Sequence, residues 1–182
     1  MRLLRLVEEK PDAAIRNKVS EAIKLASEEW KPLVFEGVYP KAGFGIATLR
    51  PKDICFDGSS LTGTAQSSIA WIFSLAAAST WYNIVDLTLS QDLYVVLTGI
   101  HSRTANPAIT NIKPVIDGSD LPILNIEEMY TWDLAAAYFT EPILVKPSTG
   151  LRIRAIGTEA RTAEYFGFIG QTVAKRPFLI KE

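Results

Sequence analysis

His101 is the residue in this chain that is best suited to acid–base or metal chemistry, and it is the single histidine. A histidine-based metal site of the kind that oxygenases use needs two or three histidines with a carboxylate, so His101 alone cannot fill one. A Ser-His-Asp arrangement would need an activated serine, and no G-x-S-x-G nucleophile elbow occurs. We therefore predict that His101 is an ordinary residue at a strand end or turn.

The segment GSSLTGT, Gly58 to Thr64, has two glycines at the separation found in phosphate-binding loops. Thr64 stands where such a loop carries its lysine, and the flanking sequence predicts neither a strand before it nor a helix after it. A phosphate group would therefore find neither the lysine nor the helix N-terminus that normally binds it. The composition instead indicates a flexible Gly/Ser connector.

Oxygen ligands gather around Gly118, where Asp117, Ser119 and Asp120 lie within four residues. They supply only part of the six to eight oxygens that calcium takes. Asp-Gly between two apolar runs is also a common hairpin turn, and we favour that interpretation.

Two pairs of acidic residues, Glu127 with Glu128 and Asp86 with Asp92, have the composition of a glycosidase acid pair. Pairs of this kind occur often by chance. Neither these acid pairs nor the single histidine is a specific sign of catalysis. We therefore predict that the chain is not an enzyme, and that it has no catalytic residue, no cofactor and no metal.

The overall charge does not indicate a particular class of binding partner. The chain of 182 residues carries 19 basic and 20 acidic side chains, a net charge of -1, so no broad field attracts nucleic acid or an anionic membrane. Cys55 is the single cysteine, which excludes an intrachain disulfide, and the N-terminus lacks the apolar run of an export signal. We expect synthesis in a cytoplasm and no sequence-specific recognition of nucleic acid.

No charged residue occurs between Asp57 and Asp86. The most apolar part, IAWIFSLAAA at 69–78, is much shorter than the roughly 20 residues that a membrane span requires. Polar residues also interrupt the stretch, so we predict no membrane span. The pattern is typical of a buried or subunit-facing strand.

The N-terminal region has helical periodicity from Asp12. One apolar stripe follows it, and the stripe consists of Ile15, Val19, Ala22, Ile23, Ala26 and Trp30. Pro11 and Asp12 form a plausible start, and Pro32 ends the pattern. We predict one amphipathic helix whose stripe packs against the rest of the chain or against a neighbour.

From residue 69 onward the pattern is strand, turn, strand. Eight candidate strands cover 69–76, 81–89, 93–101, 109–116, 121–127, 137–145, 150–157 and 164–174. The clearest is 150–157, where Leu151, Ile153 and Ala155 alternate with Arg152 and Arg154. Short strands without crossover helices predict an antiparallel eight-stranded sandwich, of which the jelly roll is a member.

This interpretation divides the chain into three regions. Residues 1–35 form an N-terminal arm and the amphipathic helix, residues 36–66 a connector rich in Gly and Pro, and residues 67–182 the sandwich domain. The fold class is mainly β, an antiparallel sandwich preceded by a helix.

The aromatic residues favour packing over chemistry. We expect them to fill the core or an interface between subunits, where large aromatic area dominates the energetics. The predicted interface residues are Ile15, Val19, Ile23, Trp30, Trp71, Phe73 and Trp81. The alternative is a carbohydrate- or receptor-binding module, which would expose two or three tryptophans together on one surface.

The order of LTLSQDLYVVLTGI, VIDGSDLPI, EPILVKPSTGLRIRAIG and EYFGFIGQTVAKR resembles the single jelly-roll proteins of archaeal and bacterial virus particles. The resemblance covers about residues 80–176 and lies in strand order and turn placement. It implies a virion structural protein, as a capsid, vertex or decoration subunit. It also implies a homo-oligomer that contacts other virion proteins, made in a host cytoplasm and located in the virion.

Overall fold

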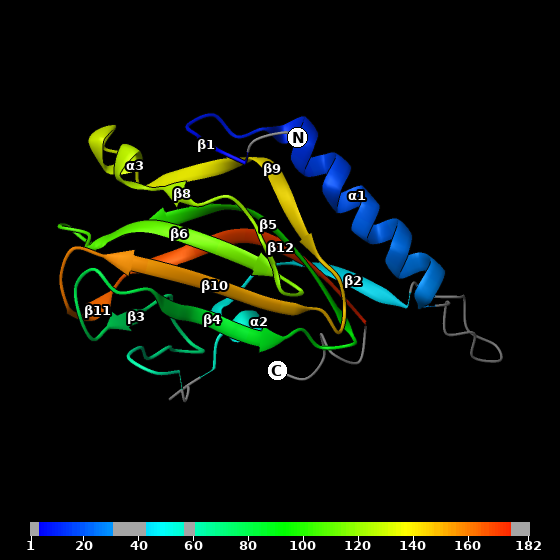
Figure 1. Cartoon of the computed structure of the whole chain (residues 1–182). Coiled ribbons are helices and arrows are strands. Elements are labelled where there is room, and N and C mark those ends of the chain that lie inside the picture. Colours follow the sequence, from blue (N-terminus) through cyan, green and yellow to red (C-terminus); the bar gives the residue numbers. More distant parts are fainter. Residues whose placement is uncertain (1–3, 31–42, 57–60, 176–182) are drawn as a thin grey trace.

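The computed structural model describes residues 4–30, 43–56 and 61–175, and within them the chain is mainly β with antiparallel sheets and few helices (Figure 1). The helices are α1 (Asp12–Glu29), α2 (Pro51–Ile54) and α3 (Glu127–Thr131). The first strands are β1 (Leu6–Val7), β2 (Phe44–Thr48), β3 (Phe73–Leu75), β4 (Tyr82–Thr88), β5 (Leu93–Ser102) and β6 (Ile109–Ile116). The others are β7 (Ser119–Asp120), β8 (Leu124–Asn125), β9 (Ala136–Val145), β10 (Gly150–Gly157), β11 (Arg161–Glu164) and β12 (Phe166–Lys175).

One sheet has the strand order β1-β9-β5-β12-β2, and each neighbouring pair is antiparallel. Helix α1 packs against β9, β5 and β12, so we call this layer the covered sheet. In Figure 1 the helix lies beside the end of β9, on the side away from β4, β6 and β10. The covered sheet therefore has apolar neighbours on both of its faces.

The other sheet has the order β4-β10-β6-β7, and β8 also pairs with β6. The long helix α1 packs on the covered sheet, and α3 contacts this sheet at β6; we call this second layer the open sheet. The alternation predicted for 150–157 is confirmed in β10: Leu151, Ile153 and Ala155 are buried in the core, and Arg152 on the other face is exposed. Buried and exposed side chains must alternate along a strand when one face of its sheet contacts the core and the other contacts solvent.

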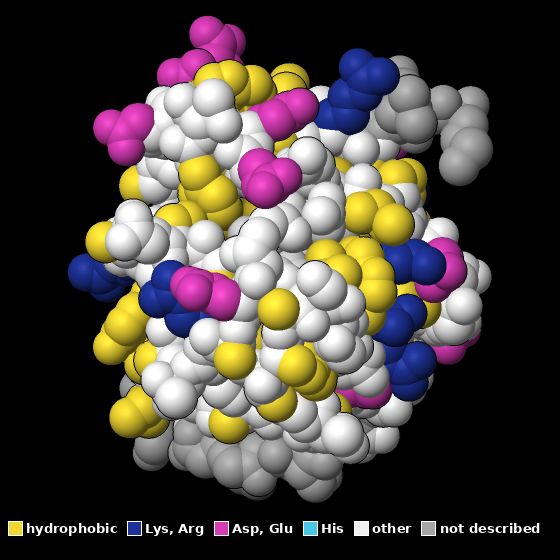
Figure 2. Space-filling model, turned by 60° about the vertical axis from the view of Figure 1, so that its left-hand side comes forward, with side chains coloured by type: hydrophobic (Ala, Val, Ile, Leu, Met, Phe, Trp, Pro, Cys, Tyr) yellow, Lys and Arg dark blue, Asp and Glu magenta, His cyan; other side chains and the backbone are white. Residues whose placement is uncertain are grey.

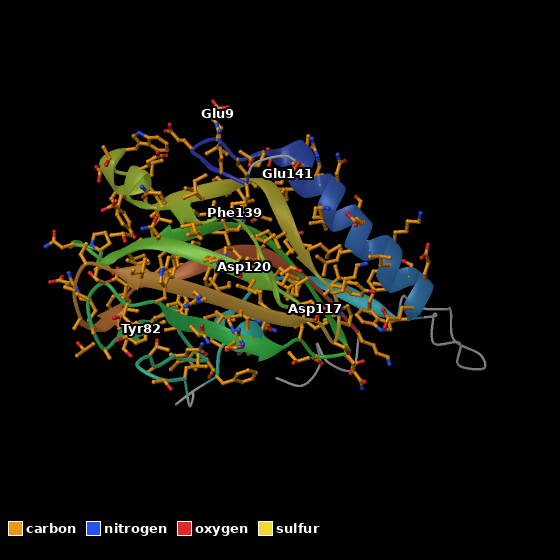
Figure 3. All side chains as sticks on the ribbon, in the orientation of Figure 1. Glu9, Tyr82, Asp117, Asp120, Phe139 and Glu141 are labelled. Atoms are coloured by element: carbon orange, nitrogen blue, oxygen red, sulfur yellow. The ribbon has the colours of Figure 1, made fainter. Side chains whose placement is uncertain are left out.

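The hairpin between β6 and β7 confirms the turn predicted at Asp117-Gly118. Both residues have positive φ angles, 49° and 78°, and Ile116 pairs with Ser119 across the two-residue turn. That combination favours Asp-Gly, because glycine adopts positive φ without steric cost and aspartate tolerates it. Asp120 on β7 makes an ion pair with Lys113 on β6, and this pair links the two strands of the hairpin (Figure 3).

Helix α1 spans the stretch with apolar periodicity. Its residues Ala22, Ala26 and the following Trp30 form a cluster with Tyr94, Val96 and Val173 of the covered sheet. The Trp30 and Tyr94 rings meet edge to face at a centroid distance of 5.3 Å. The Tyr94 hydroxyl donates to Glu29 at 2.6 Å. The apolar stripe of α1 thus faces its own sheet.

The predicted connector over 36–66 contains one strand of the covered sheet, β2. Residues 44–48 pair with 171–175 of β12 and complete the edge of the covered sheet. The glycines at 43 and 45 give this segment the composition of a loop, and a partner strand distant in sequence supplies its pairing. Residues 31–42 and 57–60 of that region lie outside the described residues.

Two predicted strands also differ from the structure. In 69–76 only Phe73–Leu75 is a strand, and it pairs with β11 in a separate two-stranded sheet. In 121–127 the strand is limited to Leu124–Asn125, after which α3 begins. The Asn125 side chain accepts a hydrogen bond from the Glu127 amide at 2.9 Å, which favours a turn into the helix.

The main core lies between the covered and the open sheet. Among its largest fully buried side chains are Phe73, Phe139, Phe166, Leu97 and Ile112. Figure 3 labels Phe139 on β9. Both Phe73 and Phe166 pack edge to face against Phe168, with ring centroids 6.3 and 5.6 Å apart. The short β3 is therefore anchored in the core through Phe73, although it belongs to neither large sheet.

Candidate assembly surface

The uncharged stretch found in the sequence forms a surface segment at one end of the sandwich. We call residues 61–80 the flap; it contains β3 and the loops on either side. Its most exposed large side chain is Ile69, with 88% of its surface accessible, and Ala76, Ala77 and Ala78 are exposed as well. The flap has no charged residue over its 20 positions, although charged side chains are common at water-facing surfaces.

Figure 2 shows the end of the molecule that lies on the left in Figure 1. Charged side chains lie at the top, along the right-hand flank and in a group at the left of the middle in this view, and the lower centre shows hydrophobic groups among uncharged atoms. Interface cores have the same composition, with few charges and more apolar groups than the rest of a surface. The flap is thus the candidate surface for contact with another molecule.

The flap has a defined structure. Gly63 has a φ of +75°, and the Tyr82 ring lies so close that a Cβ atom at Gly63 would be 2.1 Å from it. Figure 3 shows Tyr82 at the start of β4, near the flap loop. A residue with a side chain would have to displace this ring and accept an unfavourable φ. Gly63 therefore fixes the flap against the open sheet.

Polar side chains inside the flap complete its backbone pairing. The Thr64 hydroxyl donates to the Ser74 carbonyl at 2.6 Å, and the Ser74 hydroxyl accepts from the Ala65 amide at 2.7 Å. The Gln66 amide group donates to the Ile84 carbonyl and accepts from the Phe56 amide. In the segment predicted as a flexible connector, 58–64, the hydrogen bond of Thr64 holds the described end in place. Residues 58–60 lie outside the described part of the chain.

A groove of about 500 Å³ is lined by the paired strands β3 and β11 and by residues 63–65. It is lined by small or apolar residues that include Ala65, Leu75, Ala76 and Ala160, and by Arg161 as a charged residue. Small side chains allow a partner backbone to approach closely. The flap thus has an exposed apolar side chain, Ile69, and a groove next to it on the same segment.

The predicted interface residues fall into two groups. Ile15, Trp30 and Phe73 are buried in contacts within this chain, and Val19 and Ile23 pack half-buried beside them on α1. The buried ones are covered by contacts within this chain, and their role at an interface between subunits stays a prediction.

Trp71 and Trp81 are half-buried. The Trp71 ring packs edge to face against His101 and Phe168, with centroids 6.3 and 5.8 Å apart. The guanidinium of Arg154 lies over the Trp81 ring, 5.7 Å from its centroid. Each tryptophan leaves part of its surface accessible next to the flap or the open sheet.

The side chains that the sequence analysis considered for catalysis or metal binding take part in packing contacts and ion pairs. His101 lies against Trp71 and opposite Gly167, and burial with the nearby Arg103 lowers its pKa. Burial raises the pKa of the Cys55 thiol to about 12, so it stays protonated at neutral pH. Within residues 4–30, 43–56 and 61–175, no group of three His, Cys, Asp or Glu side chains is arranged to hold a metal ion.

The acid pair Asp86 and Asp92 is separated into two ion pairs. Asp86 accepts from Arg152 at 2.9 Å and from Asn83 at 2.8 Å. Asp92 lies 3.6 Å from the ammonium of Lys175. Each acid ties one strand to its neighbour, which is an architectural role.

Sequence reasoning missed the solvent exposure of the flap. The absence of charge marked the segment as unusual, but periodicity could not show which residues face water. Ile69 and the three alanines at 76–78 are the residues that the structure adds to the candidate surface.

No protein-family model matches this chain, and a comparison with curated protein sequences gives no match. Among the described helices, none has both the length and the apolar content needed to cross a membrane.

Proposed function

We propose that this chain is a virion structural protein, a capsid, vertex or decoration subunit that acts by assembling with copies of itself. Such a protein is made in a host cytoplasm and then resides in the virus particle. It contacts other virion proteins through its surface and needs no catalytic group or cofactor.

The strand order is the observation that carries this proposal. If β1, β3 and β11 are set aside and β7 with β8 counts as one interrupted strand, eight strands remain in the part of the chain that the structure describes. Numbered along the chain, they have the order 6-3-8-1 in the covered sheet and 2-7-4-5 in the open sheet. Two interleaved Greek keys in two facing sheets produce this order, and that is the arrangement of a jelly roll. Viral capsid proteins are a large class with this architecture.

The flap supports an assembly role and supplies a contact surface. Its exposed residues carry no charge, so a second subunit can cover them without desolvating an ion. Ile69 can insert into a recess of a neighbour, as large apolar anchors do at interface centres. The contact that we propose joins the flap to a second copy of this chain.

Solution mass tests the proposal. Light scattering on the purified chain should give a mass above that of the 20.1 kDa monomer. Ile69→Lys and Ala77→Glu should each shift the population toward monomer, because a buried unpaired charge opposes association. Ser119→Glu adds charge at an exposed position of β7 and serves as the control, with no expected change in mass.

A wild-type chain that stays monomeric at all concentrations contradicts self-assembly. Equal oligomer masses for the wild type and both flap variants would show that the flap is not the contact surface. Thermal melting of each variant distinguishes lost association from lost folding.

The alternative, a carbohydrate or receptor module with a tryptophan platform, has less support. Of the four tryptophans, Trp132 is 49% exposed, Trp30 is buried, and Trp71 and Trp81 are half-buried. A stacking platform requires two or three exposed rings on one surface. The tryptophans are not arranged in that way.

A further inference from the structure

Glu164, the last residue of β11, is a fully buried carboxyl side chain. Its Oε1 atom accepts a hydrogen bond from the Ala108 amide at 3.1 Å. Its Oε2 atom is buried as well and completes no hydrogen bond within the described residues. An ionised carboxylate with a buried, unpaired oxygen costs more free energy than the neutral acid, so this position favours a bound proton.

Glu164 joins β11 to the loop between β5 and β6, which consists of residues 103–108. Besides the Glu164 contact with Ala108, the Arg161 guanidinium donates to the Asn106 carbonyl of the same loop. Residues 162 and 163, between these two side chains, are exposed. The contact between β11 and the loop therefore depends strongly on the state of Glu164.

The same strand pairs with β3 of the flap, where Glu164 lies opposite Phe73 and Arg161 opposite Leu75. The register shifts between these two pairs, and the two strands belong to neither large sheet. Short, irregular pairings of this kind can open locally while the rest of a domain stays folded. We propose that Glu164 is a pH-dependent switch: its protonated form keeps β11 closed against the loop 103–108, and loss of the proton at higher pH opens β11. This inference does not depend on whether the chain assembles.

The groups on β11 and on the facing loop act on Glu164 in both directions. Burial raises the pKa of Glu164, and the Ala108 amide, Arg161 and the Ile109 amide oppose this rise. Glu159, which precedes β11 and makes an ion pair with Arg161, adds to the rise. Burial is the largest of these effects, so the pKa of Glu164 lies above its usual value of 4.5.

The flap and α3 add no second group that titrates near neutral pH. The flap strand β3 has no charged residue. On α3, burial raises the pKa of Tyr130 and the charge of Glu164 raises it further, so this hydroxyl stays neutral. Glu127 and Glu128 of the same helix are exposed to solvent.

His101, at the end of β5, is the remaining group to separate from Glu164. Burial and the charge of Arg103 lower the pKa of His101 below its usual value of 6.5. Its ring contacts Trp71 of the flap and pairs in register with Gly167, so its own protonation acts on a different contact from that of Glu164. A His101 variant can therefore distinguish the two titrations.

The raised pKa of Glu164 fixes the sign of the pH dependence. Below pH 4.5 the carboxyl is protonated whether β11 is closed or open, so its contribution to the closed state is fully present. Above that value the open state releases its proton first, and the closed state loses stability until the pH reaches its own, higher pKa. Rising pH therefore favours opening, by about tenfold in the equilibrium constant for each unit by which the pKa is raised.

Amide hydrogen exchange of the full chain, followed by NMR from about pH 5 to about pH 8, tests the proposal. Protection factors, which correct for the intrinsic pH dependence of exchange, should fall with rising pH at Ala108 and at 161–164, but not at 95–97 of β5. Glu164→Gln keeps an acceptor oxygen and has no titrating proton, so its protection factors should not depend on pH. Glu159→Gln removes an exposed neighbouring charge and is the matched control; it and His101→Gln should retain the pH dependence of the wild type.

A second measurement needs no variant. The NMR signal of the Glu164 carboxyl carbon in the wild type should titrate with a midpoint above 4.5. A midpoint at or below that value, protection factors at Ala108 and 161–164 that do not change with pH, or a wild-type pH dependence in Glu164→Gln would each overturn the proposal. Ile69→Lys, which we expect to be monomeric, should show the same pH dependence as the wild type, so this result and the assembly result can fail separately.

Discussion

The covered sheet and the open sheet have the same antiparallel construction but opposite outer faces. On the covered sheet, Tyr94, Val96 and Val173 point outward and are buried beneath α1. On the open sheet, the outward positions of β10 are Arg152 and Arg154, which meet Asp86 and Trp81. The strand framework does not decide which face is wet; the side chains at alternate positions do.

This difference shows why the two sheets need different neighbours. Apolar outward residues on the covered sheet require a helix over them, and α1 supplies it from the same chain. Charged outward residues on the open sheet satisfy one another through ion pairs across neighbouring strands. Substitutions at the two outer faces should therefore have very different energetic effects.

Deletion of residues 1–31 should have the largest effect, because it removes α1 and exposes the outer face of the covered sheet. Burial of several side chains at about 1.5 to 3 kcal/mol each is comparable to the total stability of a domain, about 5 to 15 kcal/mol. We expect the truncated chain to lose cooperative unfolding, measured by circular dichroism during heating. A truncated chain that melts as the full chain does would show that the covered sheet does not depend on its helix.

A charge placed on each outer face gives the sharpest comparison. Val96→Asp puts a carboxylate beneath α1 and should lower the free energy of unfolding by about 3 to 5 kcal/mol. Thr88→Asp, at an exposed position of β4, should change it by less than about 0.5 kcal/mol. Urea unfolding of both variants measures the difference, and equal losses would remove the distinction between the sheets.

Tyr94→Phe should have a smaller effect on the covered sheet. It removes the hydrogen bond from the Tyr94 hydroxyl to Glu29 and keeps the ring contact with Trp30. We expect a loss of about 0.5 to 1.5 kcal/mol in urea unfolding. The double variant with Glu29→Gln reports the coupling, and additive losses would mean that the two groups do not interact.

Arg152→Ala should have the smallest effect. The Arg152–Asp86 pair is partly exposed, so its loss should cost less than about 1 kcal/mol, and the cost should shrink in high salt. Unfolding at low and high ionic strength measures this. A large, salt-independent loss would mean that the open sheet relies on buried contacts at this position.

Local patterns in the sequence were sufficient to predict an element where the residue types within it decide its structure. The alternation in 150–157 predicted β10 and its two faces, and Asp117-Gly118 predicted the turn between β6 and β7. The apolar stripe of α1 predicted which residues face a partner, but not that the partner is the chain's own sheet. In each case the local signal was correct and the choice of neighbour was a tertiary effect.

Other parts of the fold depend on contacts that local patterns do not contain. β2 contains a glycine and is paired only because β12 lies beside it. The flap was noticed for its lack of charge, but its conformation depends on the hydrogen bonds of Thr64 and Gln66, which local patterns do not predict. The buried polar residues Ser102, Tyr130 and Glu164 come from three separate segments, so no spacing in the sequence brings them together.

The pairing of β1 with β9 has a consequence for synthesis of the chain. Arg5 and Thr140 hydrogen bond across a sequence separation of 135 residues, and Leu6 pairs with Phe139. Residues 6–7 are translated before β9, so they have no strand to join until residues 136–145 have been made. During that interval the apolar side of the N-terminal helix stays in water or on a chaperone, and contacts this distant in sequence slow folding.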